Sequence, residues 1–83
     1  MKELNTETKA ALVRNIVNGI DTVASFDYVD REGNHSHRLV RVDSYKPDEK
    51  GNWTFYNYSD RAEQKGGIRS FKSDRISNFQ IVD

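Results

Sequence analysis

The chain has 83 residues, of which 35% are hydrophobic and 31% charged, with 13 basic and 13 acidic residues and no cysteine. This length allows one small domain, and the lack of cysteine excludes a disulfide framework and a thiolate metal site. Because the net charge is zero, any attraction for nucleic acid must come from a local patch. No apolar run approaches the roughly 20 residues of a membrane span. No signal peptide is apparent after Met1, so a cytoplasmic protein is expected.

The first predicted element is a helix over residues 6–18. Asn5 or Thr6 can cap its start, and Gly19 suits its end because glycine accepts a left-handed backbone. An apolar stripe follows helical spacing and is expected to pack on the rest of the domain. Its residues are Leu12, Val13, Ile16, Val17 and Ile20. The alternative is that this stripe docks on a partner protein.

Short strands joined by polar turns follow the helix. Alternating side chains predict strands over residues 21–30 and 35–45, with a turn at Arg31–Asn34 between them. Both faces of the second strand mix apolar and charged residues, so its pattern does not tell which face is buried. Three more strands are expected, over residues 53–58, 68–72 and 76–82.

This order of elements, with no crossover helix, predicts an α+β fold that is mainly β. We expect a single domain over residues 1–83, in which a short N-terminal helix precedes a small five-stranded antiparallel SH3-like or Sm-like barrel over about residues 21–82.

A segment near the C-terminus mixes basic and apolar side chains. It follows Gly66-Gly67 and reads Ile68-Arg69-Ser70-Phe71-Lys72-Ser73-Asp74-Arg75-Ile76. Arg69 and Phe71 share one face if the segment is extended. Ser73-Asp74 is typical of a turn, which is expected to direct Arg75 and to bury Ile76.

This segment resembles the hallmark of the WYL domain, a small Sm-like or SH3-like barrel. The family's Trp-Tyr-Leu stretch corresponds to Trp53-Thr54-Phe55, and Phe26-Asp27-Tyr28 and Arg38 occupy the places of its upstream aromatic strand and strand-opening arginine. The resemblance runs from about Ala10 to Val82. It departs from the family at Thr54, where the family has tyrosine, at Val42, where proline is usual, and in having no room for a preceding helix-turn-helix.

The resemblance implies a ligand-sensing or regulatory module that recognises single-stranded nucleic acid or a nucleotide-like ligand and controls an effector. The basic residues that it assigns to the site are Arg38, Arg69, Lys72 and Arg75, with Trp53 and Tyr56 as neighbouring aromatics. Apart from the resemblance, His37, which lies beside Arg38, and Arg41 are further candidates for ligand contact.

The chemistry of these side chains fits such a site, since guanidinium groups match phosphate oxygens and exposed aromatic rings stack bases. We expect the basic groups to converge on one exposed surface. The structural alternatives are that Trp53 belongs to the core and that the arginines form ion pairs.

No nucleophile–base set, glycine-rich phosphate loop or cofactor motif is visible, so neither an enzyme nor a cofactor is expected. His35 and His37 lack further ligands at metal-site spacing. The second function hypothesis is a protein–protein interaction module, phage or mobile-element encoded, that modulates a host protein. A homodimer is a further expectation.

Overall fold

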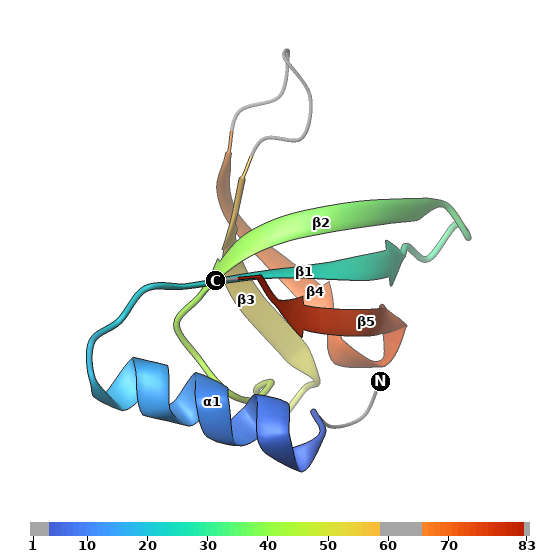
Figure 1. The fold of residues 1–83 in the computed structure, drawn as a ribbon. Coiled ribbons are helices and arrows are strands. Elements are labelled where there is room, and N and C mark those ends of the chain that lie inside the picture. Colours follow the sequence, from blue (N-terminus) through green and yellow to red (C-terminus); the bar gives the residue numbers. More distant parts are fainter. Residues whose placement is uncertain (1–3, 59–65, 83) are drawn as a thin grey trace.

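The computed structural model describes residues 4–58 and 66–82, which form an α-helix and an antiparallel sheet (Figure 1). The expected α+β, mainly β fold is confirmed. In chain order its elements are the helix α1 (Thr6–Val17), the strands β1 (Thr22–Val29), β2 (His35–Val42), β3 (Asn52–Asn57) and β4 (Gly67–Lys72), a 3₁₀ turn η1 (Ser73–Arg75), and the strand β5 (Ile76–Ile81).

Local capping fixes both ends of α1. The side-chain oxygen of Asn5 accepts a hydrogen bond from the Thr8 N–H at 2.8 Å, which satisfies one of the free donors of the first turn. At the other end Gly19, with φ +67°, donates to the Ile16 carbonyl at 3.1 Å, and Ile20 donates to the Asn15 carbonyl at 2.9 Å. This pair of bonds is a Schellman motif. No helix in the described residues is long and apolar enough to cross a membrane.

The apolar stripe expected along α1 is only partly covered by the sheet. Leu12 is fully buried, and Ile16 packs against the core. Val17 is 77% exposed, and Ile20, just past the helix, is 53% exposed. The stripe is therefore wider than the contact that the helix makes with its own domain.

The strands pair in the order β4-β3-β2-β1-β5, each antiparallel to its neighbours. β1 and β2 pair along their whole length, whereas β2 meets β3 only at Val40 and Arg41. Figure 1 shows that β3 and β4 run steeply across β1 and β2 as a result. In the described residues β4 and β5 are the sheet edges, joined through η1. The sheet is curled, because Phe79 of β5 stacks on Trp53 of β3 and the Tyr28 hydroxyl of β1 accepts the Lys72 N–H of β4 at 3.1 Å, while β4 and β5 do not pair with each other in the part of the chain that the structure describes.

The inner face of β2, which the sequence pattern left undecided, carries Arg38, Val40 and Val42. These residues lie opposite the buried residues of β1, and the two valines are themselves buried. The core that they border is mainly aromatic. The Phe26 ring is fully buried and lies 5.1–6.4 Å from four other rings, those of Tyr28, Phe55, Phe71 and Phe79.

Two turns repeat the same five-residue pattern, Asp-x-x-Gly-Asn. The first is Asp30–Asn34, between β1 and β2, and the second is Asp48–Asn52, before β3. In each, one carboxylate oxygen of the aspartate accepts two backbone N–H groups at 2.9 Å, and the glycine has a positive φ. The second turn also receives the Ser73 N–H on the Gly51 carbonyl at 2.9 Å, which ties it to η1.

Candidate functional site

The predicted site residues are divided between the two faces of the sheet. Strand register places Arg38 and Arg69 on the inner, core-facing side. On the outer side, which faces away from the core, it places His37, Arg41, Tyr56 and Lys72. The expected convergence of Arg38, Arg69, Lys72 and Arg75 on one surface is therefore wrong, because Lys72 lies on the opposite face of β4 from Arg69.

The two inner-side arginines lie at the rim of the core. The Arg38 Nε donates to the Ser36 Oγ at 3.0 Å, and its guanidinium carbon lies 5.7 Å from the centre of the Phe71 ring. Arg38 is thus half-buried, with its stem along the core edge. Arg69 lies opposite Phe55 in β3 and is exposed.

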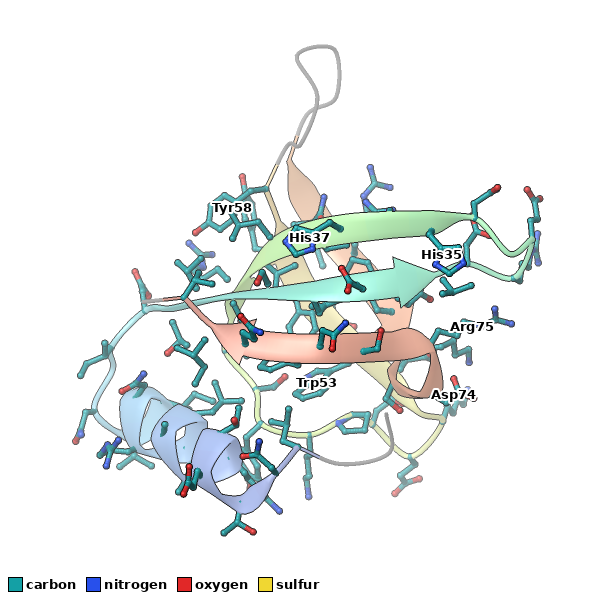
Figure 2. The ribbon with its side chains drawn as sticks, turned by 45° about the vertical axis from the view of Figure 1, so that its right-hand side comes forward. His35, His37, Trp53, Tyr58, Asp74 and Arg75 are labelled. Atoms are coloured by element: carbon teal, nitrogen blue, oxygen red, sulfur yellow. The ribbon has the colours of Figure 1, made fainter. Side chains whose placement is uncertain are left out.

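Arg75 connects η1 to the end of β1. Its guanidinium donates to the Val29 carbonyl at 3.5 Å. Backbone N–H donation, chiefly from Asn34, holds the pKa of the neighbouring Asp30 below its ordinary value, and the charge of Arg75 adds a smaller lowering. Figure 2 shows Arg75 and Asp74 at the η1 turn. This position indicates that Arg75 mainly joins two parts of the fold.

Trp53 lies in the core. Its side chain is 2% exposed, stacks on Phe79 at 5.5 Å, and donates its indole N–H to the Ser44 Oγ at 2.8 Å. The indole ring and the indole N–H of Trp53 therefore both make contacts within the domain, and Trp53 does not offer a ring to a ligand. The exposed aromatic surface of the protein is formed by other residues.

That surface lies on the outer side of β2, β3 and β4. The Arg41 guanidinium carbon is 5.0 Å from the centre of the Tyr56 ring, and the Tyr58 ring meets Tyr56 edge-on at 5.5 Å. Ile68 in β4 lies opposite Tyr56 and is 68% exposed. Leu39, whose carbonyl receives the Tyr58 N–H, is 42% exposed. We call Leu39, Arg41, Tyr56, Tyr58 and Ile68 the outer patch.

A groove continues from the outer patch along β3. The segment between β2 and β3 forms one wall, and Thr54, Tyr56 and Ile68 contribute to the lining. The Lys46 Nζ lies 5.9 Å from the centre of the Tyr45 ring in that wall, so a second cation rests against an aromatic face. Asp43 and Asp48 also line the groove, and one oxygen of Asp48 is already bound to backbone N–H groups.

A polar cluster on the outer side of β1, β2 and β5 was not foreseen. The His37 Nδ1 and the Asp27 Oδ1 are 2.8 Å apart, and the Asn78 amide donates to the other Asp27 oxygen at 2.8 Å. Asn78 has φ +54° at the irregularity where β5 pairs with β1. The hydrogen bond from His37, followed by that from Asn78, lowers the pKa of Asp27.

The cation–aromatic pairs could not be located from spacing alone. Arg41 and Tyr56 were both candidates, but Tyr58 and Ile68 became part of the same surface only through the β2–β3–β4 register. The available signal was that Tyr56 and Tyr58, two residues apart in a strand, point to the same face.

The basic residues of the outer side lack acidic partners. Within residues 4–58 and 66–82, neither Arg41 nor Lys72 has a carboxylate at ion-pair distance. In the same residues, no group of three His, Asp or Glu side chains is placed to hold a metal.

Comparison with known proteins adds no relative to this geometry: no family model, curated protein or solved structure matches the chain. The resemblance to the WYL domain therefore stays a prediction, and the site has to be judged on its own side chains.

Proposed function

We propose that this chain is a non-enzymatic, WYL-like binding module that recognises single-stranded nucleic acid or a nucleotide-like anion and acts as an accessory regulator. The observation that carries the proposal is the position of the Arg41 guanidinium over the Tyr56 ring, 5.0 Å from its centre, with Tyr58 edge-on beside Tyr56. These side chains offer a positive charge and aromatic surface at one place on an exposed sheet face.

The chemistry of that arrangement suits a nucleotide. A base stacked on an aromatic ring or a guanidinium plane contributes about 1–3 kcal/mol, and the same arginine can donate to a phosphate oxygen. Among the residues that the structure describes, no carboxylate lies at ion-pair distance from Arg41. Tyr56 is fixed by strand pairing on both sides, to β2 and to β4, so little order has to be gained on binding.

The inner-side arginines support the proposal less. Arg38 already lies over Phe71 and donates to Ser36, so a ligand would have to compete for its guanidinium. Arg69 is exposed but lies on the other face of β4 from Ile68 and Lys72. We therefore assign ligand contact to the outer patch, with Lys46 and Lys72 as additional cations.

Titration of a labelled single-stranded oligonucleotide, followed by fluorescence anisotropy, tests this proposal. Binding is expected to weaken between about 50 mM and about 200 mM salt because counterions are released. Tyr56→Ala is expected to reduce affinity about tenfold, the equivalent of losing one base stack. Arg41→Gln should reduce both the affinity and its dependence on salt.

Arg31→Gln is the matched control, since it removes the same charge from an exposed position in the β1–β2 turn. It should leave binding unchanged. The outer patch is ruled out as the binding site if the Arg41→Gln and Arg31→Gln variants bind the oligonucleotide with the same affinity. It is also ruled out if binding is lost only in the double variant of the inner-side arginines, Arg38→Gln with Arg69→Gln. If oligonucleotide binding is insensitive to salt and to all of these substitutions, the proposed recognition of nucleic acid is refuted.

A further inference from the structure

The backbone pairing between β2 and β3 is interrupted beside the groove. The ladder ends at the pair Arg41–Tyr56, and residues 43–48 then turn away from β3 to form the opposite wall of the groove. Figure 1 shows this segment running toward α1 before the chain enters β3. In the part of the chain that the structure describes, Thr54 therefore lies beside the groove with no strand paired to it on that side.

Strand alternation determines where the backbone groups of Thr54 point. Two residues earlier, Asn52 donates its N–H to the Asp48 carboxylate at 2.9 Å and accepts the Asp48 N–H at 2.9 Å. Just past the end of β3, Tyr58 donates its N–H to the Leu39 carbonyl at 3.0 Å. These bonds leave the chain on the groove side, and every second residue of a strand points its N–H and C=O the same way. The N–H and C=O of Thr54 therefore point toward the groove.

The pairing with β4 agrees with this direction. The Ser73 N–H donates to the Gly51 carbonyl at 2.9 Å, so alternation gives the backbone bonds between β3 and β4 to the residues on either side of Thr54. The hydroxyls of Thr54 and Ser70 lie 2.8 Å apart, as expected for a directly opposed pair that no backbone bonds join. Among the described residues, no hydrogen bond joins the Thr54 N–H or C=O to the opposite wall.

Aromatic and charged side chains line the groove around these backbone groups. Tyr45 and Tyr56 lie on its two walls, and the Lys46 Nζ is 5.9 Å from the centre of the Tyr45 ring. Asp43 also lines the groove, is exposed, and has no cation at ion-pair distance within residues 4–58 and 66–82. The hollow has a volume of about 550 Å³, which is within the range of small-molecule sites. Its size and lining suit a flat ring with polar groups on its edge.

We propose that the groove binds the guanine base of a nucleotide ligand, an assignment that rests on the proposed function. Thr54 supplies one N–H donor and one carbonyl acceptor, and the Asp43 carboxylate supplies a further acceptor. Guanine carries the complementary set on its Watson–Crick edge, with O6 as acceptor and N1–H and the N2 amino group as donors. Adenine has one donor group on that edge, and cytosine and thymine each have two acceptors, one of which would face the carboxylate.

Other occupants fit the groove less well. An added β-strand needs a row of free backbone groups, whereas the next residues of this row on either side, Asn52 and Tyr56, are already paired within the domain. A phosphate in the groove would lie beside the carboxylates of Asp43 and Asp48, which repel it. The phosphate of the bound nucleotide is therefore directed out of the groove, toward Arg41 in the outer patch.

Base substitution within one oligonucleotide tests the proposal. The probes are fluorescein-labelled thymidine oligonucleotides of about 11 nucleotides with guanine, hypoxanthine or adenine at the central position, and their affinities are compared by fluorescence anisotropy. The guanine probe should bind at least about tenfold more tightly than the adenine probe, as expected of a paired hydrogen-bond contact. Hypoxanthine lacks only the N2 amino group, so its probe should lose most of this advantage.

Variants of two exposed aspartates locate the recognition. Asp43→Ala should bind the guanine and hypoxanthine probes with the same affinity, because the acceptor for the N2 amino group is gone. Asp74→Ala is the matched control, since it removes the same charge from an exposed position in η1. It should keep the wild-type preference, whatever the lost negative charge does to the affinity for all probes. Retention of the guanine preference in Asp43→Ala, or its loss in Asp74→Ala, overturns the proposal.

Hydrogen exchange of the Thr54 amide, followed by NMR, is a second test. In the free protein this amide should exchange at least about tenfold faster than that of Phe55, whose N–H faces β4. Binding of the guanine probe should slow the exchange of Thr54 by a similar factor. A Thr54 amide that is already protected in the free protein, or that exchanges at the same rate in the complex, contradicts the proposed contact.

Failure of base recognition is distinguishable from failure of the proposed function. If the guanine and adenine probes bind with the same affinity and Arg41→Gln still weakens both, the nucleic-acid interface stands and the guanine site is refuted. If none of the probes binds, both are refuted.

Discussion

Asp27 shows how one residue can be tuned by neighbours from two strands. His37 on β2 and Asn78 on β5 each bind one of its carboxylate oxygens at 2.8 Å. Both contacts favour the ionised form, so the pKa of Asp27 lies below its ordinary value, with His37 as the larger cause and Asn78 the second. The positive φ of Asn78 directs its amide into this position, a conformation that Asn tolerates better than most residues.

We predict that Asn78→Gly raises the pKa of Asp27 toward its ordinary value, because glycine keeps the positive φ but removes the amide donor. His37→Ala should raise it further, since His37 is the larger cause. Measurement of the Asp27 carboxyl carbon shift against pH by NMR gives both values. Gln80→Ala, an exposed neighbour on β5, is the control and should leave the titration unchanged. An unaltered titration in Asn78→Gly would show that its hydrogen bond does not stabilise the carboxylate.

The same lowered pKa values set a direction for acid stability. A carboxyl group that ionises more readily in the folded state stabilises that state above its unfolded pKa, about 3.9 for Asp, and loses this contribution as pH falls through the folded value. Asp27 and Asp30 both follow this rule. We expect the urea midpoint to fall below about pH 4, and to fall less in Asn78→Gly than in the wild type. An equal fall in both proteins would contradict a contribution from Asp27.

At the scale of elements, the two Asp-x-x-Gly-Asn turns depend on glycine for backbone conformation rather than for space. Gly33 has φ +85° and Gly51 φ +79°. A Cβ at Gly33 would meet nothing within 4 Å, and one at Gly51 would meet only the Ser73 Oγ at 3.8 Å. Substitution at either position therefore introduces strain in the backbone and no clash.

We predict that Gly33→Ala and Gly51→Ala each lower the free energy of unfolding by about 1–2 kcal/mol, the cost of a left-handed backbone for an L-residue. Gly67→Ala is the matched control, because Gly67 has no positive φ and open space at its Cβ. It should be neutral or slightly stabilising, since alanine restricts the unfolded chain. Urea denaturation of the three variants gives the comparison, and equal losses in all three would refute the role of φ.

The elements themselves were largely predictable because their signals are local. Asn5, Gly19 and the turn at Arg31–Asn34 act through their own backbone neighbours. The course of the chain after β2 was harder to predict, since β2 ends at Val42 and not at residue 45. The buried side of α1 was also not predictable, because Leu12 and Val17 are both apolar and the position of the sheet decides which of them is buried.

At the scale of the whole molecule, the candidate site was the least predictable feature. Alternation along a strand tells which residues share a face, but the curl of the sheet decides which face is exposed. Arg69 and Lys72 are close in sequence and lie on opposite faces, whereas Arg41 and Tyr56 are distant in sequence and lie in contact. The outer patch thus depends on the β2–β3 register, which no single strand carries in its own pattern.

One contact joins strands that are not neighbours in the sheet. Phe79 of β5 stacks on Trp53 of β3 at 5.5 Å with the rings 3° from parallel, and also lies 6.1 Å from the Phe26 ring. β3 and β5 are separated in the sheet by β2 and β1. This stack is therefore part of what keeps the sheet curled.

We predict that Phe79→Ala lowers the free energy of unfolding by about 2–3 kcal/mol, less than a fully buried phenylalanine because Phe79 is half-buried. Since Trp53 is the one tryptophan of the chain, its emission reports directly on the stack and should shift to longer wavelength as water reaches the ring. Gln80→Ala, exposed on the other face of β5, should change stability by no more than about 0.5 kcal/mol. Unchanged emission in Phe79→Ala, with stability equal to that of Gln80→Ala, would mean that the curl of the sheet is maintained without this stack.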